Sequence, residues 1–187
     1  MLESFRRRMA DELEGWRRVI DDAGRTLVGA GAFPSLDAYR REVARYSAHL
    51  LTTVAAMDGD ISPDEMLAML FAGMGGVSSP QEYFGAIEGM RHQLLHRSEA
   101  LEDIPLFLER AADHDLAQGT ALAATVTDAL LGMAETVMVA DLADDASERL
   151  FLDGYRLQLA RFFEERGIER RPEPGQLPMP RRALSDG

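Results

Sequence analysis

The stretch Met57-Asp58-Gly59-Asp60-Ile61-Ser62-Pro63-Asp64-Glu65 separates two runs of apolar residues that recur at steps of three and four. Gly59 is placed to end the first helix in a left-handed conformation. Ser62-Pro63-Asp64-Glu65 has the order of a capping box, with Ser62 at the N-cap and Glu65 at the third helical position. The stretch therefore predicts a helix, an acidic joint and a second helix.

A second joint, Ala140-Asp141-Leu142-Ala143-Asp144-Asp145-Ala146-Ser147-Glu148, repeats this arrangement 83 residues later. Asp58 corresponds to Asp141, and Glu65 corresponds to Glu148, while Asp145 takes the place of serine as the N-cap. The repeat predicts a fold with an internal pseudo-two-fold relation between its two halves.

The remaining chain also carries helical signals rather than strand-type alternation or hairpin dipeptides. Helices are expected over about residues 2–28, 36–57, 63–73, 79–98, 103–115, 118–140 and 145–166. The sequence thus predicts the all-α class, as a compact bundle of about seven helices.

Three parts are expected along the chain: an N-terminal amphipathic helix extension over 1–35, a helical domain over 36–167 and a Pro/Arg-rich tail over 168–187. We expect the first helix to pack its apolar stripe on the bundle, with attachment to a membrane surface or a partner as the alternative. Prolines exclude helix from the tail, which is expected to be disordered unless its segment 177–184 acts as a linear docking motif.

Charge and composition exclude several classes of function. The net charge is −12, and residues 34–165 alone hold nine Arg against 23 acids. Such a body repels phosphate backbones, which disfavours nucleic-acid binding and favours cations or a basic protein partner; a solubilising surface is the simpler explanation. The chain has no cysteine and no lysine, so thiolate catalysis, disulfides, Schiff-base chemistry and a Walker lysine are excluded.

The N-terminal residues lack the apolar core of a secretory signal, and acids interrupt the longest apolar stretch, near residues 121–143. A soluble, cytoplasmic protein without a membrane span is expected. Its oligomeric state is open.

The aspartates of the two joints suggest a cation site. Asp58 and Asp141 are expected at helix C-termini, where the carbonyl groups already concentrate negative potential. A hard cation would compensate this charge, and an all-oxygen ligand set suits Ca²⁺ or Mg²⁺. The predicted ligands are Asp58, Asp60, Asp64 and Glu65 at the first joint, with Asp141, Asp145 and Glu148 at a weaker second site. Plain helix capping is the alternative role for the two glutamates.

The first joint is not a regular EF-hand. Asp58, Asp60, Ser62 and Asp64 fit loop positions 1, 3, 5 and 7, but Pro63 stands where glycine is required and Met69 where the bidentate glutamate is required.

Other candidate sites are weaker. His92 and His96 lie four residues apart on a predicted helix, a spacing that can chelate zinc, and Glu88 or Glu99 could complete a site. The His-Glu-x-x-His order and a further histidine ligand are lacking, so a solvated or interface pair is expected. His49 is expected to be a core histidine with its hydrogen bonds satisfied. No nucleophile elbow or Ser-His-Asp pattern is present, so we expect no enzyme; a hydrolase using the clustered acids is the remaining catalytic alternative.

The pattern Asp-Gly-x-Ile-x-x-x-Glu between two apolar helices, present once in full and once in part, resembles the TerB-like (tellurite-resistance) family. The first joint matches it at Asp58, Gly59, Ile61 and Glu65, whereas the second keeps Asp141 and Glu148 but has Leu142 and Asp144 at the glycine and isoleucine positions. The resemblance covers about residues 36–167. It implies an acidic, all-α bacterial module that takes divalent cations, has no established catalysis and works in a stress-response or defence-related protein assembly.

Overall fold

The computed structural model describes residues 2–57, 61–72, 103–140 and 146–168. Within these ranges the chain forms helices and no strand, which confirms the all-α class. The helices are α1 (Leu2–Gly29), α2 (Leu36–Ala55), α3 (Pro63–Phe71), α5 (Leu106–Gln118), α6 (Leu122–Met138) and α7 (Ala146–Glu165). The helix predicted over residues 79–98 lies outside the described residues.

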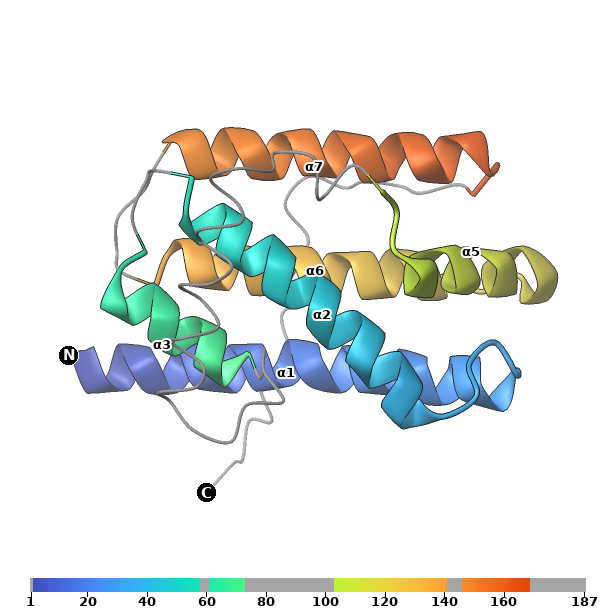
Figure 1. Cartoon of the computed structure of the whole chain (residues 1–187), viewed down its shortest axis with the longest axis horizontal. Coiled ribbons are helices and arrows are strands. Elements are labelled where there is room, and N and C mark those ends of the chain that lie inside the picture. The colour runs from blue at the N-terminus through green and yellow to red at the C-terminus, as the bar shows by residue number, and fades with distance from the viewer. Residues whose placement is uncertain (1, 58–60, 73–102, 141–145, 169–187) are drawn as a thin grey trace, which may run out of the picture.

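Helix α6 is the centre of the bundle. Figure 1 shows α1, α6 and α7 as three aligned rows with α6 between the other two, while α2 runs diagonally across α6 and α1. α6 contacts α1, α2, α3, α5 and α7. Because its neighbours surround it, α6 is apolar around most of its circumference, and its last nine residues are buried except Glu135.

Helix α1 belongs to the same hydrophobic core as the other helices. Its apolar stripe is buried, as predicted, at Met9, Leu13, Trp16 and Ile20. The stripe packs mainly on α6, with further contacts to α2 and α3. The N-terminal helix therefore lies on the bundle; the limits of the three predicted parts stay a prediction.

Two glycines allow the helices to approach closely. A Cβ atom added to Gly132 on α6 would lie 2.5 Å from the Trp16 indole of α1. A Cβ added to Gly24 on α1 would lie 2.4 Å from the Tyr39 ring of α2. Since both aromatic rings are buried, the contacts of α1 with α6 and α2 depend on the absence of these side chains.

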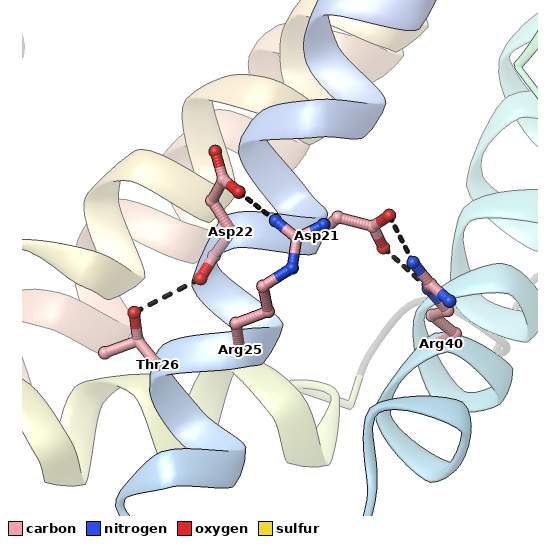
Figure 2. Close-up of polar contacts among 5 residues, drawn as sticks. All are labelled: Asp21, Asp22, Arg25, Thr26 and Arg40. Carbon is pink, nitrogen blue, oxygen red and sulfur yellow. Dashed lines mark hydrogen bonds and ion pairs between the residues drawn. The ribbon is translucent and has the colours of Figure 1, made fainter.

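Polar contacts on the outside of the bundle join α1 to α2 (Figure 2). The Arg40 guanidinium donates two hydrogen bonds to the Asp21 carboxylate, at 2.9 and 2.7 Å, and these bonds hold the pKa of Asp21 below its usual value. In the same view, Arg25 pairs with Asp22 within α1, and the Thr26 hydroxyl donates to the Asp22 carbonyl. Of the contacts drawn in this view, the Arg40–Asp21 pair is the one that links two helices.

The sequence placed the end of α5 too early. An end near residues 113–115 was expected, but the helix continues to Gln118 and ends at Gly119, which has φ +69°. The expected start of the following helix at residue 118 is wrong for the same reason, because Gly119 separates α5 from α6. Gly167 ends α7 as predicted, with φ +68°. Among the described helices, none is both long and apolar enough to cross a membrane.

Candidate functional site

The first joint begins where α2 ends. Ala56 leaves the helical conformation (φ −96°, ψ 1°), and its N–H donates to the Thr52 carbonyl. The Met57 N–H then donates to the Val54 carbonyl, at 3.1 Å. Asp58, Gly59 and Asp60, which carry two of the predicted ligands, lie outside the described residues.

The start of α3 is a capping box, as predicted. The Ser62 N–H donates to Glu65 Oε2 at 2.6 Å, and the Glu65 N–H donates to Ser62 Oγ at 3.1 Å. Ile61, just before the N-cap, is buried, and Glu65 itself is only 4% exposed. The carboxylate is therefore held at the positive end of α3 and shielded from bulk water.

Asp64 already has a cationic partner within the chain. Arg6 Nη2 lies 2.7 Å from Asp64 Oδ1, and this ion pair ties the start of α1 to the start of α3. Both side chains are partly exposed, so the pair contributes modestly to stability. Any cation that used Asp64 as a ligand would have to compete with Arg6.

The second joint has the same helix ends. Val139 leaves the helix at φ −97° and ψ 8°, its N–H donates to the Glu135 carbonyl, and the Ala140 N–H donates to the Val137 carbonyl. α7 begins at Ala146, and Glu148 at its third position is 3% exposed. Asp141 and Asp145 lie outside the described residues.

Four of the seven predicted ligands thus fall on residues that the structure does not describe, and the other three are Asp64, Glu65 and Glu148. In the described ranges, no three His, Asp or Glu side chains are grouped so that they could hold a metal ion. The predicted cation site stays a prediction.

His49 differs from expectation. It lies on α2, half-buried, and its buried Nε2 atom has no hydrogen-bond partner among the described residues, whereas satisfied hydrogen bonds were expected. Burial lowers the pKa of the imidazole, because the charged form loses its hydration. His92 and His96 lie outside the described residues.

Two polar features were missed by the sequence analysis. The first is Asp115, 4% exposed, whose carboxylate accepts bonds from Thr120 Oγ1 (2.5 Å), the Leu122 N–H (2.7 Å) and the Ala123 N–H (2.7 Å). The N-cap residue of α6, Ala121, has no side chain able to cap, so Asp115 caps α6 from the preceding helix. The capping residue that the sequence offers near this helix start is Thr120, but its hydroxyl donates to Asp115 instead.

The second missed feature is a pair of tyrosines between α2 and α7. The hydroxyl oxygens of Tyr46 and Tyr155 lie 2.5 Å apart. Burial raises the pKa of Tyr46 to about 12 and that of Tyr155 well above its ordinary value. The two phenols therefore stay protonated and act as a structural hydrogen bond. Aromatic periodicity alone does not reveal such a pair.

Comparison with known proteins adds no relative. No model of a protein family, no curated protein and no solved structure matches the chain.

Proposed function

We propose that this chain is a non-enzymatic, acidic, TerB-like module whose first joint binds a divalent cation, Ca²⁺ or Mg²⁺, within a stress-response or defence-related protein assembly. The observation that carries the proposal is the repetition, 83 residues apart, of the helix ends that flank the two joints.

The helix ends support an internal repeat. The last residues of α2 and α6, Ala55 and Met138, are 83 positions apart, and so are the first residues of α3 and α7, Pro63 and Ala146. The hydrogen bonds that close the helices follow the same offset, from Ala56 N–H to Thr52 and from Val139 N–H to Glu135. Backbone conformation at the two C-caps agrees within a few degrees.

Side chains follow the repeat as well. The Thr53 hydroxyl donates to the carbonyl four residues earlier at 2.8 Å, and the Thr136 hydroxyl, 83 positions later, does the same at 2.7 Å. Glu65 and Glu148, equally related, are both buried. These matches support a pseudo-two-fold bundle of about seven helices, of the type that the TerB-like resemblance implies.

The described contacts divide the predicted ligands by role. Glu65 is occupied as a cap, and Arg6 holds Asp64. We therefore assign the main ligand role to Asp58 and Asp60, with Glu65 and Asp64 as supporting carboxylates. By the same division, Asp141 carries the weaker second site, and Asp145 and Glu148, the expected caps of α7, support it.

Calorimetric titration of the full chain with Ca²⁺, Mg²⁺ and Mn²⁺ tests this assignment. We expect saturable heat with at least one of these ions, loss of that heat in Asp58→Asn, and a smaller loss in Asp141→Asn. Asp37→Asn is the matched control, since Asp37 is an exposed acid in the first turn of α2, at the opposite end of that helix from the first joint. Absence of heat, or equal heat in Asp58→Asn and the control, contradicts the cation site.

The alternative function is a metal-free adaptor that binds a partner through the N-terminal helix or the C-terminal tail. The apolar stripe of α1 is packed in the core, which leaves this helix only its charged face for a partner. The tail is then the better candidate. A pull-down from cell extract with the full chain and with a chain shortened after residue 168 distinguishes binding by the N-terminal helix from binding by the tail. Loss, on shortening, of the partners captured by the full chain assigns binding to the tail.

A further inference from the structure

Helix α7 has an apolar face that no described element covers. Leu150 and Leu157 are 75% and 63% exposed, and Gly154 lies between them on the same side of the helix. α7 forms one outer row of the bundle in Figure 1. An open groove of about 410 Å³ runs along this helix from Gly154 to Glu165, and Leu157, Phe162 and Ile104 give it apolar walls.

We propose that this groove binds the segment Leu177-Pro178-Met179-Pro180-Arg181-Arg182 of the same chain. The proposal does not depend on cation binding at the joints. Residues 169–187 lie outside the described part of the structure. The groove, the point where the chain leaves α7 and the sequence of the segment support its binding there.

The chain leaves α7 beside the groove. The Gly167 N–H donates to the Glu164 carbonyl and the Ile168 N–H to the Phe163 carbonyl, so the chain leaves α7 in a fixed Schellman turn. Leu177 follows Ile168 by nine residue steps, a reach of about 28 Å in an extended proline-rich chain. The groove from Gly154 to Glu165 is only about 16 Å long. Leu177 can therefore reach every part of it.

The chemistry of the two surfaces matches. Prolines at 178 and 180 restrict the segment to an extended form, so little conformational entropy is lost on binding, and Leu177 and Met179 supply apolar anchors for a groove lined by an aromatic ring. Arg181 and Arg182 follow them. The C-terminal end of α7 carries the negative end of the helix dipole, and the one acid in the groove lining, Glu165, is balanced by Arg161.

A tethered segment also has an advantage over a second copy of the chain. A short flexible tether gives an effective concentration in the millimolar range. A second copy must instead overcome repulsion between two bodies of charge −12 each.

Paramagnetic labelling tests the proposal in the full chain. The sequence has no cysteine, so Ala183→Cys gives a single site for a nitroxide label. We expect the label to broaden the amide signals of Gly154, Leu157 and Ile104 selectively. A chain that also carries Leu177→Ser and Met179→Ser should lose this broadening, and so should Gly154→Phe, which fills the groove at a position where an added Cβ meets no atom within 4 Å.

Two outcomes overturn the proposal. Uniform or absent broadening over α7 in the labelled chain means that the segment does not occupy the groove. Broadening that appears equally in isotope-labelled wild-type protein mixed with spin-labelled, isotope-free protein means that the occupant comes from a second copy. Gly29→Phe is the matched control for Gly154→Phe, because Gly29 is also exposed on a helix with open space around it.

Discussion

Replacing Asp115 by alanine should destabilise the bundle more than replacing any exposed acid. The Asp115 carboxylate is buried between α5 and α6 and accepts three hydrogen bonds, two of them from the first N–H groups of α6. Asp115→Ala removes all three acceptors and leaves the Ala123 N–H, on a fully buried residue, without a partner. The central helix of the bundle then begins without a cap.

The expected loss is about 3 kcal/mol. A hydrogen bond to a charged acceptor contributes about 1.5–3 kcal/mol, and loss of an N-cap alone costs about 0.5–2 kcal/mol. We take a value well below the sum of three bonds, because Thr120 is exposed and water can replace its partner. For a domain with a total stability of about 5–15 kcal/mol, this is a large fraction.

Urea unfolding followed by the fluorescence of the single tryptophan, Trp16, measures the loss. With an m value of about 2 kcal/mol/M, the midpoint should fall by about 1.5 M. Asp115→Asn keeps one acceptor oxygen and should lose about half as much.

Asp113→Ala is the matched control. Asp113 lies two residues earlier on the same helix, is mostly exposed and pairs with Arg166, so its loss should stay within about 0.5 kcal/mol. If Asp115→Ala lowers the free energy of unfolding no more than Asp113→Ala does, the Asp115 carboxylate does not cap α6.

Three further predictions concern packing and protonation. Gly132→Ala should lower the free energy of unfolding in urea by about 1–3 kcal/mol, because the new Cβ meets the Trp16 indole. Gly154→Ala, with open space around the new Cβ, should be neutral or stabilising. Equal effects of the two substitutions would contradict the close contact between Gly132 and Trp16. Burial depresses the folded-state pKa of His49, so its contribution to stability is intact above the unfolded value of about 6.5 and is lost as the pH falls below that value. Between pH 7 and 5, the stability of His49→Gln should therefore depend less on pH than that of the wild type. An unchanged pH dependence would contradict the depressed pKa of His49. Burial raises the pKa of Tyr46 to about 12, so the protein should lose stability as the pH rises above about 10, the pKa of an unfolded tyrosine. Tyr46→Phe should reduce that loss in alkaline unfolding curves. An identical curve would show that the phenol is not buried in solution.

The candidate site was only partly accessible to sequence reasoning. Ser62 and Glu65 could be assigned to a capping box because that motif is local, with both partners three residues apart. The Arg6–Asp64 ion pair could not be predicted from the sequence, since its partners are 58 residues apart and meet only when α1 lies across α3. Asp115 was misassigned to a helix end for a related reason: its role depends on where α6 begins.

Sequence periodicity is enough to predict the helical class, the apolar stripe of α1 and the common offset of 83 residues between the helix ends at the two joints. These properties follow from local repeats and from the burial of one helix face, which a linear pattern records. Three-dimensional packing alone reveals that α6 is central and that Gly24 and Gly132 leave room for aromatic rings. It also reveals that Tyr46 is hydrogen-bonded to Tyr155 and that Asp115 caps a second helix. Each of these depends on packing angles and on contacts between distant parts of the chain, which many sequences with the same pattern would place differently.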